Sequence, residues 1–174
     1  MADPSSPTGV DAPVQVQVVV ADEQSELDID ATRWAELAAA VLRSERRDGE
    51  LTLTFVDRDE IAALNEEHLG KVGATDVLSF PLDDDPSDVA AGPVLLGDVV
   101  ICPSVAAEAA ANHAGTLDDE LALLTVHGVL HVLGHDHAEA DERTTMQAAE
   151  MEHLRNHHWN GPAPAGFRQE HIDT

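Results

Sequence analysis

The chain has 174 residues, of which 43% are hydrophobic and 25% charged, and this suits one globular domain with a sizeable core. Its 34 acidic and 9 basic residues give a formal net charge of −25, and a uniformly acidic surface repels nucleic acid, so charge alone argues against an RNA or DNA ligand. No apolar run approaches the ~20 residues of a membrane helix, and the single cysteine, Cys102, cannot form an internal disulfide, which suits a reducing cytoplasm.

The amino-terminal part of the chain predicts a tail, a strand and a helix. Residues 1–13 hold three prolines and neither basic residues nor an apolar segment, so we expect a disordered tail rather than a secretory signal. Residues 14–20 alternate and then become fully apolar, as in a strand that enters a buried sheet. Apolar residues then recur at helical spacing, which predicts a helix from Asp28 or Asp30 to about Arg47.

Alternation, helical spacing and capping residues also predict the later elements. A strand at 51–56 is followed by a helix from Asp57 or Asp59 to about Gly70. Two further strands are expected, one at 77–80 that is stopped by Pro81 and one at 94–101 that is broken by Gly97. Three helices then begin at Pro103, at Thr116 or Asp118, and at about Glu139, the last of them ending near His157. This order indicates a single α/β domain with one mixed four-stranded sheet and about five helices. We place the domain at residues 14–158 and a carboxy-terminal tail at 159–174.

Three histidines occupy one predicted helix and the turn after it. His127 and His131 are four residues apart and therefore lie on the same face of a helix. Gly134 stands where a left-handed glycine can end a helix and reverse the chain, which would bring His137 round to the same point. Three converging imidazoles form a zinc site with an open fourth position, as on the metal-binding helix of zincins. We therefore predict that His127, His131 and His137 are metal ligands.

The alternative interpretation is that these histidines are core residues, but every ring nitrogen would then need a hydrogen-bond partner. The spacing repeats the histidine-glutamate-x-x-histidine-x-x-glycine-x-x-histidine pattern of metzincin peptidases, except that Gly128 replaces the glutamate. That glutamate is the general base, so its loss argues against peptide hydrolysis. We expect a glutamate restored at position 128 to favour water activation, provided that its side chain fits.

The same stretch resembles the YbeY family of bacterial RNA-processing metalloproteins. The family pattern is histidine-glycine-x-leucine-histidine-x-x-glycine-x-aspartate-histidine, and residues 127–137 agree with it at each fixed position. Residues 75–81, which read Thr-Asp-Val-Leu-Ser-Phe-Pro, and 96–101, which read Leu-Gly-Asp-Val-Val-Ile, also agree with the family in the right order. The resemblance covers about residues 14–158. It implies the same α/β architecture, one zinc ion per chain, and an endoribonuclease that acts in ribosomal RNA maturation and ribosome quality control.

Four residues are candidates for catalysis or substrate binding. Asp136 adjoins a predicted ligand, where it would orient a histidine or a water, or else cap the chain reversal. By resemblance, residues 75–81 border the active cleft, where Ser79 and Asp76 would hold a phosphate or a water, or simply bond along an edge strand. Asp136 and Ser79 are the catalytic candidates, and no general base is assigned. Lys71 is the fourth candidate, for substrate binding.

One departure from the family concerns phosphate binding. Many members carry arginine at the position of Leu69, and that arginine is thought to hold the RNA phosphate. Lys71 is the nearest cation and would substitute only as a point charge, without the bidentate geometry of arginine. Five of the eight arginines fall within residues 33–58, so a local basic patch remains an alternative. The remaining histidines at 113, 153, 157, 158 and 171 share no ligand spacing, and we expect them at the surface.

Three functions stay open on the sequence alone. The first is a cytoplasmic zinc-dependent endoribonuclease. The second, favoured by Leu69 and the acidic composition, is a non-catalytic ribosome-assembly factor with a structural zinc, and the third is a zinc hydrolase of another substrate. Because the net charge opposes direct RNA binding, we expect the small ribosomal subunit or a basic ribosomal protein to present the ribosomal RNA. No membrane or DNA partner is expected.

Overall fold

Four strands form one mixed sheet at the centre of the protein. The structure is a computed structural model that describes residues 14–82, 94–135 and 139–169. The strands are β1 (Val16–Asp22), β2 (Gly49–Phe55), β3 (Val77–Pro81) and β4 (Leu95–Ile101). Their order in the sheet is β1-β2-β4-β3, with β3 antiparallel to β4 and the other neighbours parallel. The predicted mixed four-stranded sheet is confirmed, and β3 lies at its edge.

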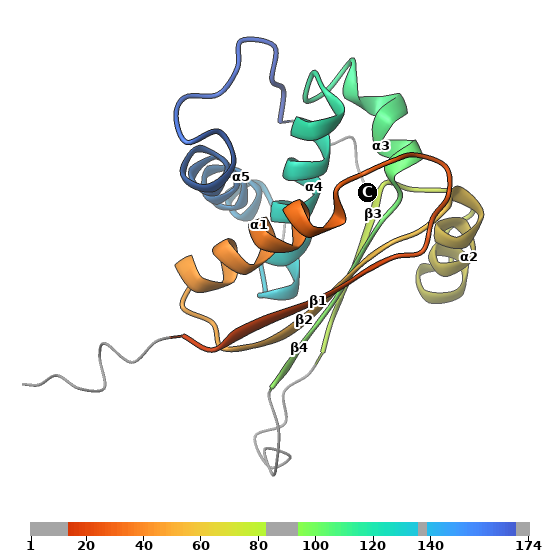
Figure 1. Cartoon of the computed structure of the whole chain (residues 1–174), viewed down its shortest axis with the longest axis horizontal. Coiled ribbons are helices and arrows are strands. Elements are labelled where there is room, and N and C mark those ends of the chain that lie inside the picture. The colour runs from red at the N-terminus through yellow and green to blue at the C-terminus, as the bar shows by residue number, and fades with distance from the viewer. Residues whose placement is uncertain (1–13, 83–93, 136–138, 170–174) are drawn as a thin grey trace, which may run out of the picture.

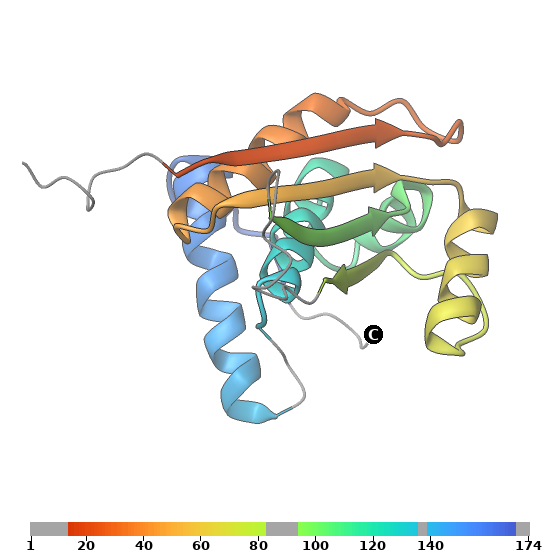
Figure 2. The same cartoon turned by 90° about the horizontal axis from the view of Figure 1, so that it is seen from below.

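The helices lie mainly on one side of the sheet. The described residues form α1 (Ala31–Ser44), α2 (Arg58–Leu69), α3 (Pro103–Ala110), α4 (Leu117–Val132) and α5 (Ala140–Leu154), which continues into one π-helical turn, η3 (Arg155–Trp159). Figures 1 and 2 show α1 and α4 against one face of the sheet, with α5 outside them and α2 beyond the strand ends. The single α/β domain with five helices is therefore as predicted.

Helix α4 is the central helix of the core. Thirteen of its sixteen residues are buried, because the sheet, α1, α3 and α5 surround it. Thr116 caps its first turn, since the Thr116 hydroxyl accepts a hydrogen bond from the Asp119 N–H at 3.1 Å. The helix ends in the left-handed Gly134, with the Gly134 N–H bonded to the His131 carbonyl and the His135 N–H bonded to the Leu130 carbonyl. Both predicted ends of this helix are confirmed.

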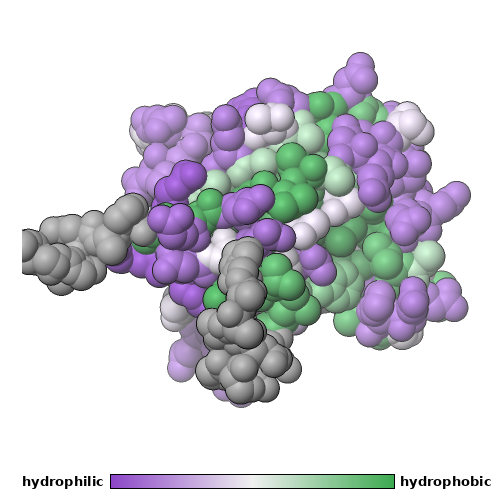
Figure 3. Space-filling view, turned by 60° about the horizontal axis from the view of Figure 1, so that its bottom comes forward, coloured by the Kyte–Doolittle hydropathy of each residue, from purple (hydrophilic) through white to green (hydrophobic). Residues whose placement is uncertain are grey.

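The sheet has one covered face and one more open face. The large core cluster joins the covered face to α1 and α4, while a smaller cluster that includes Ile61, Leu78 and Val100 joins α2 to the opposite face. Figure 3 views that opposite side, where hydrophobic side chains gather between hydrophilic ones, and Val19 and Leu95 are among the exposed hydrophobic residues. None of the helices in the described part of the chain has the length and apolar character needed to cross a bilayer.

One predicted boundary was wrong. Gly97 does not break its strand, because β4 continues through it with a register shift opposite Glu50 and Leu51. A Cβ at Gly97 would lie 2.6 Å from the Phe80 carbonyl oxygen, so glycine permits a close approach of the neighbouring backbone. The last predicted helix, from about Glu139 to His157, agrees with α5 and η3 together, although the hydrogen bonding changes from α-helical to π-helical after Leu154.

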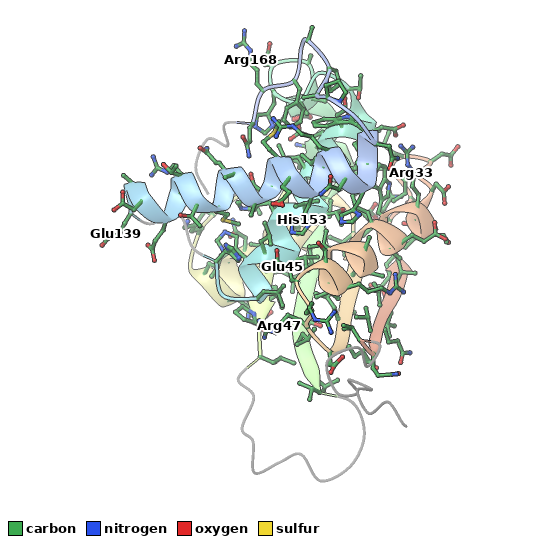
Figure 4. The ribbon with its side chains drawn as sticks, turned by 90° about the vertical axis from the view of Figure 1, so that its left-hand side faces the viewer. Arg33, Glu45, Arg47, Glu139, His153 and Arg168 are labelled. Carbon is green, nitrogen blue, oxygen red and sulfur yellow. The ribbon has the colours of Figure 1, made fainter. Side chains whose placement is uncertain are left out.

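Several histidines predicted at the surface are instead enclosed and hydrogen-bonded to acids. His153 is buried and its Nε2 lies 2.7 Å from a Glu45 carboxylate oxygen, a pair that joins α5 to the end of α1 (Figure 4). His113 pairs in the same way with Glu120, and His158 with Asp119, each at 2.8 Å. The surface prediction was wrong for these residues because each acidic partner belongs to another element: Glu45 follows α1, and Asp119 and Glu120 lie in α4. His171 lies outside the described residues.

Gly128 sets the distance between α4 and the sheet. An added Cβ at this position would lie 2.6 Å from Cγ1 and 3.2 Å from Cγ2 of Val99, a buried residue of β4. Real Cβ atoms do not approach other carbon atoms this closely, and the branched valine side chain has few other rotamers to adopt. The absence of a side chain at position 128 therefore allows α4 to pack closely on β4.

We predict that Gly128→Ala destabilises the protein although alanine is the better helix former. Overpacking costs about 1–3 kcal/mol, against about 1 kcal/mol gained in helix propensity, so the free energy of unfolding should fall by up to about 2 kcal/mol. Urea denaturation measures this change. The control is the same substitution in a Val99→Ala background, where the contact is gone and the penalty should vanish. A Gly128→Ala variant more stable than the wild type would contradict the packing argument.

Candidate metal centre and cleft

A cleft of about 420 Å³ runs along the edge strand β3. His127 and His131 line it from α4, Ser79 lines it from β3, and Leu69 and Lys71 line it from the end of α2 and the loop that follows. These residues are up to 62 positions apart in the chain (Leu69 to His131). The cleft thus brings together four residues that the sequence predicted for metal or substrate binding, namely His127, His131, Ser79 and Lys71. It also contains Leu69, where the resemblance led us to expect an arginine.

The two histidines of α4 lie side by side in the cleft wall. Their ring centroids are 4.6 Å apart, with the ring planes inclined at 78°. The third predicted ligand, His137, and the adjacent Asp136 lie outside the described residues. Within residues 14–82, 94–135 and 139–169 no group of three His, Cys, Asp or Glu side chains is arranged to hold a metal ion. The convergence of His137 with the other two histidines therefore stays a prediction.

His127 has a carboxylate partner on its inner side. The Nδ1 atom of His127 lies 2.6 Å from Oε2 of Glu150, which comes from α5 and is only 1% exposed. A carboxylate that accepts the Nδ1 proton leaves the Nε2 lone pair for a metal ion, and histidine ligands of metal sites are commonly oriented in this way. The pairing of His127 with Glu150 thus fits a metal ion bound at Nε2.

Glu150 was missed by the sequence reasoning. It lies 23 residues from His127, and no local spacing connects the two. The available signal is its place on the inner stripe of α5, where Met146, His153 and Leu154 are also buried. A carboxylate on such a stripe requires a buried partner, because an unpaired buried charge is strongly unfavourable.

Ser79 lies on the face of β3 that meets α4. Its hydroxyl donates a hydrogen bond to the Gly128 carbonyl at 3.3 Å, directly beside the two histidines. A glutamate at position 128 does not fit because an added Cβ would lie 2.6 Å from Cγ1 of Val99, whereas its 3.4 Å distance from the Ser79 Oγ is an ordinary contact. We expected a glutamate at position 128 to favour water activation only if its side chain fitted. The packing of α4 on β4 leaves no room for that side chain.

Asp76 has a different environment from Ser79. It precedes β3, its carbonyl accepts a hydrogen bond from the Cys102 N–H at 2.9 Å, and it is not among the residues that line the cleft. Burial raises the pKa of the Asp76 carboxyl, and the nearby carboxylate of Glu120 raises this pKa further. The structure therefore does not place Asp76 with the other candidates, and its part in substrate binding stays a prediction.

The positive charge near the cleft comes from Lys71. Of the cleft-lining residues in the described part of the chain, Lys71 is the only lysine or arginine. Leu69, where the resemblance led us to expect an arginine, is 52% exposed at the cleft. Arg33 and Arg58 form ion pairs with Asp118 and Glu108, so these two arginines do not form a free basic track.

Comparisons with known proteins identify the family to which the chain belongs. A family model described as Endoribonuclease YbeY matches residues 19–158. The chain is 44% identical over 146 residues to the Endoribonuclease YbeY of Acidothermus cellulolyticus, covering 79% of this chain and 88% of that protein. It is 44% identical over 128 residues to the protein of the same name from Beutenbergia cavernae, covering 71% of this chain and 85% of that protein.

A solved structure is similar in fold. The solution structure of TM1509 from Thermotoga maritima superimposes with a TM-score of 0.53 at 24% sequence identity, covering 82% of this chain and 93% of that chain. At this identity the structural likeness concerns the fold alone. The family model and the curated relatives confirm the resemblance found in the sequence motifs. The chain belongs to the YbeY endoribonuclease family.

Proposed function

We propose that this protein is a zinc-dependent endoribonuclease that acts in ribosomal RNA maturation and ribosome quality control in the cytoplasm. The observation that carries the proposal is the single cleft in which His127 and His131 lie together with Ser79 and Lys71. The relatives named Endoribonuclease YbeY support RNA as the substrate. Proteins of this family are generally metal-dependent, and the pairing of His127 with Glu150 suits a metal ligand.

The proposed metal site holds one zinc ion per chain, bound by His127, His131 and His137. When bound, the zinc ion polarises a phosphoryl oxygen and acidifies a water molecule, so that hydrolysis does not require a strong base. The chain's own residues have separate tasks. Glu150 holds the His127 ring in one orientation, and Lys71 offers a point charge to an RNA phosphate at the mouth of the cleft.

The proton acceptor is not assigned. Gly128 removes the base that a peptidase would carry on this helix, and Asp136 and Ser79 remain the catalytic candidates. Ser79 is well placed to contact a substrate, because its hydroxyl lines the cleft and bonds only weakly, at 3.3 Å, to the Gly128 carbonyl. Asp136 adjoins the proposed ligand His137 in the sequence.

Leu69 favours a second candidate function. A leucine that is half-exposed at the cleft cannot bind a phosphate, which suits a ribosome-assembly factor whose zinc is structural and which cuts nothing. A zinc hydrolase of another substrate is the third reading. An open coordination position and cleavage of RNA distinguish the endoribonuclease from the assembly factor.

We predict that the purified protein contains one tightly bound zinc ion per chain and that His131→Ala loses it. Two imidazoles leave the ligand set incomplete, so zinc affinity should fall by orders of magnitude. Metal analysis after dialysis measures the zinc content. His68→Ala is the matched control, since His68 is an exposed histidine of α2, and this variant should keep the metal. A metal-free wild type with full ribonuclease activity would disprove the zinc proposal.

We also predict that neither the wild type nor Gly128→Glu hydrolyses peptides. The wild type lacks the glutamate base, and in the variant the new side chain has no room between α4 and Val99. Casein hydrolysis tests both proteins, and circular dichroism should show that the variant is less stable than the wild type. Robust casein cleavage by the wild type would mean that the missing base has been given too much weight.

We predict that ribosomal RNA is cut on the small ribosomal subunit and not as naked RNA. A protein of net charge −25 repels free RNA, whereas a basic ribosomal protein attracts an acidic surface and presents the RNA strand. The zinc-loaded protein is incubated with each substrate, with His127→Ala as the inactive control. Efficient cutting of naked RNA at physiological salt would refute the partner model and would indicate that the arginines within residues 33–58 bind phosphate in spite of the ion pairs of Arg33 and Arg58.

A further inference from the structure

The residues after the family-matched region fold back onto the domain. The family model ends at residue 158, yet the described chain continues to Gln169. The rings of Trp159 and Phe167 meet edge to face at 4.8 Å, and both residues pack against the core. The Arg168 N–H then donates to the His113 carbonyl at 2.8 Å, beside the start of α4. These contacts give the segment 159–169 a defined path to α5.

Gln169, at the end of that path, contacts the carboxylate that orients the metal ligand. Its Nε2 donates to Oε1 of Glu150 at 2.9 Å and to the backbone carbonyl of Gln147 at 2.6 Å. The other carboxylate oxygen of Glu150 lies 2.6 Å from Nδ1 of His127. A continuous chain of hydrogen bonds therefore runs from the carboxy-terminal segment through Glu150 to the cleft.

This arrangement fixes the carboxylate at both oxygens. A carboxylate held at one oxygen can still rotate about its last side-chain bond, whereas partners at both oxygens hold its plane. A fixed carboxylate in turn fixes the plane of the His127 ring and keeps the proton on Nδ1. Because Glu150 and His127 are buried, the hydrogen bond between them acts in a low-dielectric environment and is correspondingly strong.

We infer that Gln169 and Glu150 are positioning residues for the metal ligand His127, so that the carboxy-terminal segment is part of the metal site. This inference rests on the metal site of the proposed function. Outer partners of ligating histidines typically contribute about 10- to 100-fold in metal affinity, which is the scale expected for Glu150. Gln169 acts one step further out and leaves the carboxylate in place, so its loss should weaken zinc binding by a smaller factor.

The test is the zinc affinity of full-length variants, measured by competition with a chelator. We expect Glu150→Gln to weaken zinc binding about 10- to 100-fold and Gln169→Ala to weaken it by less. Gln169→Glu keeps the shape of the side chain but replaces the donor with a second carboxylate, so it should weaken zinc binding more than Gln169→Ala. Glu152→Gln is the matched control for Glu150, being the same change at an exposed position of α5. Gln147→Ala controls for Gln169, because it leaves the backbone carbonyl in place.

Two further measurements separate positioning from a general loss of stability. The melting temperature of the metal-free protein should be nearly unchanged in Gln169→Ala, so this variant decides the case even if Glu150→Gln folds poorly. The ¹⁵N shifts of the His127 ring in the zinc-loaded protein should move in Gln169→Ala and not in the control. Equal zinc affinity and equal shifts in Gln169→Ala and the wild type would overturn the inference. A wild type that binds zinc but cuts no RNA would refute the proposed activity and leave this inference standing.

Discussion

The close packing of α4 on β4 at Gly128 is the contact on which the rest of the site depends. Without a side chain at this position, the helix axis can approach Val99, and the hydroxyl of Ser79 reaches the Gly128 carbonyl. His127 and His131 are thereby held beside the edge strand β3 instead of being lifted away from it. A larger residue would separate the helix from the sheet, because a packed core transmits strain rather than absorbing it. The glycine that replaces the peptidase base is thus also a packing requirement.

The acidic composition has an internal role as well as a surface one. Carboxylates of Glu45, Asp119, Glu120 and Glu150 each face a histidine ring in the described structure. Three of these pairs join separate elements, namely α1 to α5, α4 to η3, and α4 to α5. Some of the carboxylates therefore hold α5 and η3 against α1 and α4 by pairing with histidines. The exposed remainder still opposes a direct approach of RNA, which is why a ribosomal partner belongs to the proposed function.

The cleft combines few charged groups with an exposed leucine. Leu69 was singled out by the resemblance as the place of a family arginine, and Lys71 supplies the cation two residues later, after the left-handed Gly70 has turned the chain. A lysine binds a phosphate as a point charge with rotatable donors, and it imposes less geometry on the phosphate than an arginine does. This difference is consistent with a substrate that is positioned largely by the particle that carries it.

The sequence by itself determined the elements whose signals are local. Thr116 as a cap, Gly134 as a left-handed end, and the four-residue spacing of His127 and His131 are each read within one or two turns of helix. The strand order, the cleft and the carboxylate behind His127 were decided only by the tertiary structure. Glu150 is 23 residues from His127, and Ser79 is 49 residues from Gly128. The buried position of His153 and the pairing of His158 escaped prediction for the same reason, since a histidine's environment depends on which distant carboxylate the packing brings to it.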